Sequence, residues 1–267
     1  MLKHEIYLIK HNKRAWIVFG FLLFLVLSDL TKIYWMNFTA YGYVWKTDYK
    51  NLASMMHPAK GAFLSAVTEG HINQMMYKWL LPIYLLLIYC DKTIEEIRSG
   101  YFSVMMLREG KKQFLKSKYK CAFVMGFMIV FLTLFVNFIL SIIMLHGGKD
   151  MGMDISYFPT HPIFVFSLKY PYITYSIYIM IVSILGGGCA MICTGLSLVV
   201  KQYRYLYVIA FLIWYIQIIA PKSLTYVMQP FIEYDWQYVL PAIAIFVVIW
   251  WIVVCCGYFY RMKKDEF

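Results

Sequence analysis

The sequence predicts an all-α membrane protein in which residues 1–267 form a single transmembrane domain. Hydrophobic residues make up 62% of the chain and charged residues 15%, whereas soluble domains carry about 45–50% and about 25%. Several apolar stretches are long enough to cross a bilayer as helices. Lysine and arginine, which give the chain a net charge of +11, gather in alternate loops. These features disfavour a soluble enzyme, a disordered chain and a DNA-binding domain.

Six transmembrane helices are expected, because a bilayer core of about 30 Å needs about 20 apolar residues. They cover approximately residues 15–35, 72–90, 121–145, 172–200, 205–220 and 239–260. The second must begin well before its apolar part, which carries Lys78 into its outer third, and Pro82 is expected to kink it. No signal-peptidase motif follows the first span, so it is interpreted as an uncleaved anchor.

The basic residues define the orientation. Of the 25 lysines and arginines, 17 fall at the termini, in the loop of residues 91–120 and in the short loop near residue 202, and all five arginines are among them. With the acidic residues included, this side carries +10 and the other side +1. The positive-inside rule therefore predicts a multi-pass protein of the cell membrane with both termini cytoplasmic. The basicity reports topology and lipid contact, and no nucleic-acid partner is expected.

Two cytoplasmic segments have amphipathic patterns. Residues 2–14 alternate Leu and Ile with Lys, which predicts either a helix on the inner membrane surface or a frayed basic flank. In the loop of residues 91–120, a polar stretch leads to a break at Ser99-Gly100 and then to an apolar-faced segment that ends at Arg108. Such a helix suits docking into a groove on a cytosolic partner. The alternative is a basic loop that only enforces topology.

Polar groups inside the spans are functional candidates. Asp29 is expected to pair with Lys32 or Lys78 at the outer end of a pathway; alternatively, the lysines extend to the interface and Asp29 faces a neighbouring helix. Asn137, which lies within the third span, also needs a partner. Gly186, Ala190 and Thr194 follow at four-residue spacing, which indicates close helix packing or, alternatively, a flexible gating point.

The sequence offers no catalytic constellation. The Walker A, HExxH and GxSxG patterns are absent, and the motif that begins at Glu95 and Glu96 has its arginine too early for a CAAX-type protease. The outer histidines are scattered, at positions 57, 71, 146 and 161, and the six cysteines are interpreted as small buried hydrophobes. We therefore expect no catalytic, cofactor-binding or metal-ligating residue and no enzyme activity in this chain.

The order of these features resembles the ABC-2-type permeases, the membrane subunits of ATP-binding-cassette transporters, especially small six-span proteins of Gram-positive bacteria. The resemblance rests on Leu81-Pro82-Ile83, Asp91, Glu95 or Glu96, Ser99-Gly100, Leu107-Arg108 and the lysines of residues 111–118, followed by Asn137 inside a span. The chain lacks the proline that often precedes the arginine in that family.

The resemblance implies two permease subunits, identical or homologous, on a dimer of cytosolic ATPase subunits that bind the ATP. The implied coupling helix and its flank comprise Glu95, Glu96, Arg98, Gly100, Tyr101, Phe102, Met105, Leu107 and Arg108. The expected function is export or expulsion of an amphipathic peptide, a lipid-like molecule or a drug. The alternatives are an integral membrane enzyme resembling an intramembrane protease and a non-transporting membrane anchor or sensor.

Overall fold

The computed structural model describes residues 11–35, 56–65, 72–151, 162–231, 234 and 236–263. Helices make up the regular structure of these residues, and a single isolated bridge joins Met56 to Asp150. The prediction of an all-α fold is confirmed for this part of the chain. The predicted surface helix of residues 2–14 lies almost wholly outside it; Asn12 caps the first described helix and Lys13 begins it.

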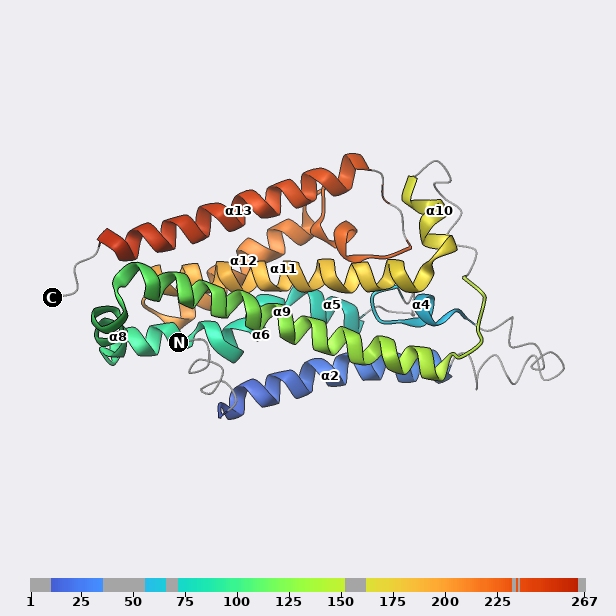
Figure 1. Ribbon diagram of the computed structural model, residues 1–267, viewed down its shortest axis with the longest axis horizontal. Coiled ribbons are helices and arrows are strands. Elements are labelled where there is room, and N and C mark those ends of the chain that lie inside the picture. The colour runs from blue at the N-terminus through green and yellow to red at the C-terminus, as the bar shows by residue number, and fades with distance from the viewer. Residues whose placement is uncertain are drawn as a thin grey trace.

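Four helices are long and apolar enough to cross a membrane, as the prediction of a helical membrane protein requires. They are α2 (Lys13–Tyr34), α9 (Lys111–Met144), α11 (Pro171–Val199) and α13 (Trp236–Lys263). All four run along the long axis of the molecule (Figure 1). A fifth apolar helix, α12 (Tyr203–Ile219), has 17 residues and is shorter.

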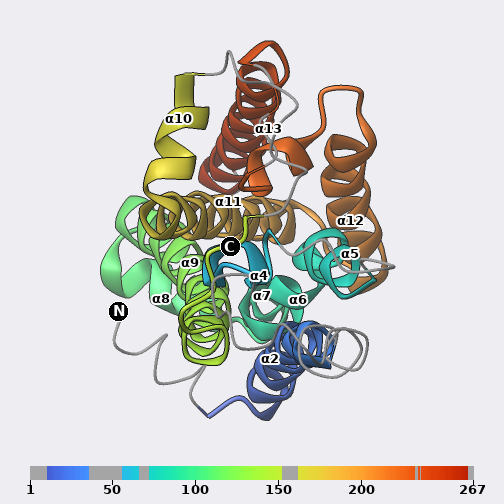
Figure 2. The same ribbon diagram turned by 90° about the vertical axis from the view of Figure 1, so that its right-hand side faces the viewer.

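Helix α11 is the central helix of the bundle. In its most apolar window 72% of the residues are buried, against 11% in α13. Viewed along the bundle, α11 lies between α9, α12 and α13, and α2 lies at the edge (Figure 2). The pattern of burial leaves one broad side of α13 directed outward, as expected for a helix that faces lipid.

The expected second span is divided into three segments: α5 (Ile72–Trp79), α6 (Leu81–Leu85) and the π-helical η3 (Leu86–Cys90). Pro82 has no N–H to donate to the Lys78 carbonyl one turn earlier. The indole N–H of Trp214 donates to that carbonyl at 2.7 Å instead. The kink expected at Pro82 is thus a break at Leu80, and the indole of α12 satisfies the carbonyl that the break exposes.

The expected cytoplasmic loop of residues 91–120 is also helical. It contains α7 (Lys92–Arg98), α8 (Tyr101–Glu109) and the first ten residues of α9, which therefore begins ten residues before the third span was expected to begin. Gly100 and Gly110 have φ angles of 75° and 84°, which residues other than glycine rarely adopt. These two glycines let the chain turn sharply on either side of α8.

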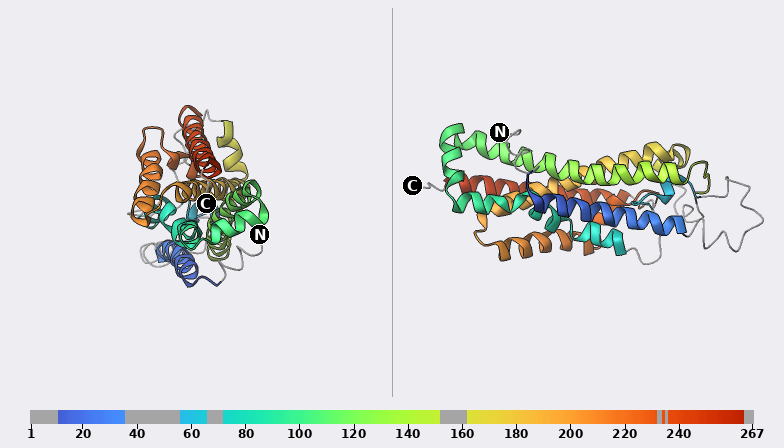
Figure 3. Two further views of the ribbon diagram at one scale, coloured as in Figure 1. Left: turned by 90° about the vertical axis from the view of Figure 1, so that its left-hand side faces the viewer. Right: turned by 90° about the horizontal axis from the view of Figure 1, so that it is seen from below.

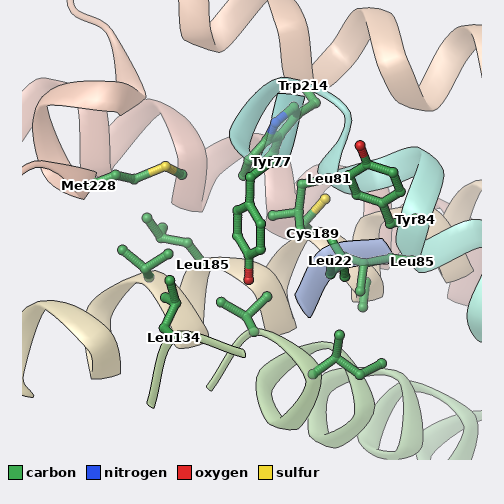
Figure 4. Packing of buried hydrophobic residues seen from close by; sticks show 14 of the residues in the cluster. Leu22, Tyr77, Leu81, Tyr84, Leu85, Leu134, Leu185, Cys189, Trp214 and Met228 are labelled. Atoms are coloured by element: carbon green, nitrogen blue, oxygen red, sulfur yellow. The ribbon is translucent and has the colours of Figure 1, made fainter. Parts of the chain in front are cut away.

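Three short elements complete the description: α4 (Pro58–Gly61), α10 (Pro162–Lys169) and the 3₁₀ helix η5 (Leu224–Met228). The core contains large side chains from several helices, including Tyr77 and Trp214, which are about 1% exposed. Figure 4 shows these two rings among Leu81, Leu185 and Cys189. The middle of the bundle is therefore filled by side chains.

Candidate functional site

One end of the bundle collects the short helices α7 and α8, the first turns of α9 and the last turn of α13 (Figures 1 and 3). Contacts between distant segments fix this arrangement. The Arg98 guanidinium donates to the Lys201 carbonyl at 2.9 Å, and the Lys111 ammonium donates to the Met262 carbonyl at 2.9 Å. The coupling residues that the resemblance implies lie on α7 and α8 and at the turn between them, at this end of the bundle.

Helix α8 is anchored by Phe102, which is fully buried. Its ring packs edge-to-face on Phe114 of α9, with the ring centroids 4.9 Å apart. The guanidinium carbon of Arg261, on α13, lies 5.1 Å from the centroid of the Phe102 ring. Arg261 is itself only 3% exposed, so the cation and the ring shield each other from solvent. Phe102 therefore joins α8 to both α9 and α13.

The opposite face of α8 has no covering element among the described residues. Val104 is 62% exposed and Leu107 is 72% exposed, and Arg108 beside them is exposed. Tyr101 and Met105 are half-buried at the edge. Of the predicted coupling residues, Phe102 is thus the anchor, and Leu107 and Arg108 lie on the outward face, to which Val104 also belongs.

The next helix back, α7, is held by a buried ion pair. The Lys118 ammonium donates to Glu96 Oε1 at 2.9 Å and lies 2.7 Å from Oε2. The two side chains are 0% and 5% exposed. The same ammonium lies 5.2 Å from the centroid of the Tyr89 ring. Glu96 therefore faces the interior and not a partner, whereas Glu95 and Arg98 are exposed.

A polar cavity of about 610 Å³ opens beside α7. Its walls carry both signs of charge and two phenols, from Arg14, Leu87, Asp91, Glu95, Arg98, Tyr203 and Tyr207. The Tyr207 hydroxyl donates to Asp91 Oδ2 at 2.9 Å. Burial raises the pKa of Asp91 above its ordinary value of 3.8, while the Tyr207 hydrogen bond and the Arg14 charge partly oppose this rise.

At the other end of the bundle the polar residues expected within the spans separate into two environments. Asp29 and Lys78 are buried, at 1% and 5% exposed, and attract each other electrostatically. Lys32, by contrast, is exposed. Of the two partners expected for Asp29, the structure places Lys78 with it in the interior and directs Lys32 outward.

Asn137 finds its partners in an unexpected place. Residues 57–65, which we call the inserted segment, enter the bundle, and all of them are buried. Asn137 Oδ1 accepts from the Phe63 N–H at 2.9 Å, and its amide donates to the Val26 carbonyl at 3.1 Å. Ser141, one turn further along α9, donates to the Pro58 carbonyl at 2.7 Å. The spans expected from the sequence did not include this buried segment.

The inserted segment has further polar contacts with the helices around it. The Tyr175 hydroxyl of α11 accepts from the Leu64 N–H at 3.1 Å, and the Gln74 amide donates to the Phe63 carbonyl at 2.5 Å. Thr133 precedes Asn137 by one turn, and its hydroxyl lies 2.7 Å from that of Tyr77. The stripe Thr133, Asn137 and Ser141 on α9 is the sequence signal that could have revealed a buried polar contact.

Gly186 lies at a close contact between α9 and α11. A Cβ atom at Gly186 would lie 2.7 Å from Val130 Cγ2, and one at Gly126 would lie 2.7 Å from both the Ala190 Cβ and the Gly186 oxygen. Ala190 thus belongs to the same contact, and Thr194 is fully buried further along α11. Sequence reasoning identified the α11 half of this contact and missed Gly126.

The described residues hold no group of three or more His, Cys, Asp or Glu side chains suited to a metal. His57 caps α4, its Nδ1 accepting from the Ala59 N–H at 3.1 Å, and burial lowers its pKa. His71 and His161 lie outside the described residues. All six cysteines are free, and Cys90, Cys121, Cys189 and Cys193 are buried.

The chain is similar to YybM of Bacillus subtilis (strain 168), an uncharacterized protein. The two are 29% identical over 266 residues, which cover 99% of this chain and 100% of YybM. The similarity therefore extends over the whole chain. No family model and no solved structure matches it.

Proposed function

We propose that the chain is the membrane-spanning permease subunit of an ATP-binding-cassette exporter in the cell membrane. In this proposal the four long helices, α12 and the broken segment of residues 72–90 form six spans. At 1.5 Å per residue, α12 measures about 26 Å, slightly less than a bilayer core of about 30 Å. The basic end of the bundle faces the cytoplasm, with both termini on that side.

The outward face of α8 is the observation that carries the proposal. Two exposed aliphatic side chains beside a cation on an anchored short helix form a surface that suits docking into a groove on a partner. Phe102 anchors this helix on α9 and α13, so the exposed face is held in one position below the bundle. We assign it to a groove on a cytosolic ATPase subunit, two of which would bind the ATP and serve two permease subunits, identical or homologous.

The cargo follows from the resemblance: an amphipathic peptide, a lipid-like molecule or a drug. Asp29 and Lys78 are the polar groups we assign to the pathway, because both lie in the interior near its outer end. If they serve transport, Asp29→Asn reduces efflux at unchanged expression. Equal losses of efflux and expression would instead assign Asp29 to structure.

Co-purification from native membranes tests the proposal. The tagged chain is expected to recover a protein with Walker A and B motifs, identified by mass spectrometry, and Arg108→Glu is expected to lose it. Lys112→Glu is the matched control, because it reverses another exposed charge four residues away. Absence of an ATPase from the wild-type sample contradicts the proposal. So does an Arg108→Glu variant that keeps both ATPase association and transport.

A further inference from the structure

A second exposed feature lies on the side of the bundle, between α9 and α13. The two helices flank a groove of about 750 Å³, and Met191 of α11 contributes to its lining. This volume falls within the usual range of small-molecule sites, about 300–1,000 Å³. The groove is independent of α8, and the proposed ATPase docking does not involve it.

The walls of the groove change in character along α9. Lys116 and Lys120, one turn apart, are exposed and lie at the end nearest α8. Beyond them the lining is apolar and aromatic. The Phe123 and Trp250 rings stack with centroids 6.2 Å apart and planes at 6°, and Trp251 beside them is 68% exposed.

One hydroxyl within the groove is already used by the protein. The Tyr119 hydroxyl donates to the Val254 carbonyl at 3.2 Å, which links α9 to α13. The charged groups of the lining, Lys116 and Lys120, both lie at the end nearest α8. A ligand that matches this surface has an anionic head and a long apolar tail.

The position of the lysines along α9 identifies the source of such a ligand. Lys116 and Lys120 lie within the first ten residues of a helix that continues as an apolar span to Met144. Lysines so placed extend to the headgroup level of the membrane. The cytoplasmic leaflet is the anionic one and attracts basic residues at its surface.

We infer that the groove binds an anionic phospholipid of the leaflet on the α8 side. Its phosphate lies between Lys116 and Lys120, and an acyl chain lies on Phe123, Trp250 and Trp251. A second copy of the chain fits the groove less well. A two-fold interface would bring the same lysines of both copies together, and like charges repel.

Fluorescence quenching by brominated lipids tests the inference. The full chain is reconstituted into phosphatidylcholine nanodiscs that contain a minor fraction of either brominated-chain phosphatidylglycerol or brominated-chain phosphatidylcholine. The signal of Trp251 is the difference between the wild type and Trp251→Phe. We expect phosphatidylglycerol to quench this signal at several-fold lower content than phosphatidylcholine.

The paired variant Lys116→Gln/Lys120→Gln is expected to abolish this preference, because one lysine beside an anionic headgroup contributes up to about fivefold, the equivalent of about 1 kcal/mol. The matched control is Lys13→Gln/Lys112→Gln, which removes two exposed lysines that do not line the groove. Equal quenching by both lipids, or an equal loss of preference in both paired variants, overturns the inference. So does a Trp251 signal that neither lipid quenches, as expected if a second copy covers the groove.

Discussion

Neutralising Glu96 alone should destabilise the protein more than removing the whole ion pair. At the 2.7 Å between Lys118 Nζ and Glu96 Oε2, an effective dielectric constant of about 20 gives an attraction of about 6 kcal/mol. Desolvation of the two buried groups offsets much of this attraction, so the pair contributes little net stability. Glu96→Gln, however, leaves the fully buried Lys118 ammonium without its counter-charge, which costs about 3–5 kcal/mol.

Thermal unfolding in detergent, followed by intrinsic fluorescence, measures this cost. For a chain of this size about 1 kcal/mol corresponds to about 2–4 °C, so Glu96→Gln should lower the Tm by about 6–20 °C. The double variant Glu96→Leu/Lys118→Met should restore most of the loss, because it removes both charges. Glu95→Gln changes an exposed neighbour and should leave the Tm within about 2 °C, since exposed ion pairs contribute little. Equal losses in the single and double variants would refute the reasoning.

Three further predictions concern packing, the inserted segment and pH. Gly126→Leu should lower the Tm strongly, because its Cβ would lie 2.7 Å from α11 and overpacking costs about 1–3 kcal/mol or more, whereas Gly20→Leu, which meets nothing within 4 Å, should not. Asn137→Leu leaves the buried Phe63 N–H unsatisfied, at about 1–3 kcal/mol, and should speed hydrogen exchange at residues 58–65 in mass spectrometry. Asp91 has a raised pKa in the folded protein, so its stabilising contribution is complete below pH 3.8 and is lost as the pH rises through the folded pKa. The Tm of Asp91→Asn relative to wild type should therefore increase from acidic to neutral pH; an unchanged difference would contradict this sign.

The sequence predicted best what depends on local composition. The four long helices begin and end within a few residues of the expected spans, apart from the start of α9. Apolar length alone determines where such helices can cross a membrane. Gly100 and Gly110 likewise mark turns, because their positive φ angles are a local property of the backbone that glycine permits. The features that were not predicted depend instead on partners far away along the chain.

The buried pair and the broken second span illustrate this limit. Lys118 appeared to belong to a solvent-exposed basic stretch, because its partner Glu96 precedes it by 22 residues on a different helix. The break at Leu80 needed a donor for the Lys78 carbonyl, and Trp214 supplies it from a helix 136 residues later. Neither spacing has a local periodicity, so no pattern in the sequence could have paired these residues.

Helix α9 links the two ends where the polar residues gather. Near its start, Phe114 packs on α8 and Lys118 pairs with Glu96 of α7. Further along, Asn137 and Ser141 form hydrogen bonds with the inserted segment. Its 34 residues span about 50 Å as one helix. Because interiors are close-packed and transmit strain, a partner that displaced α8 would tilt α9. The tilt would change the hydrogen-bond distances at the far end of α9. The proposed docking at α8 should therefore also alter the contacts of the inserted segment, because α9 touches both.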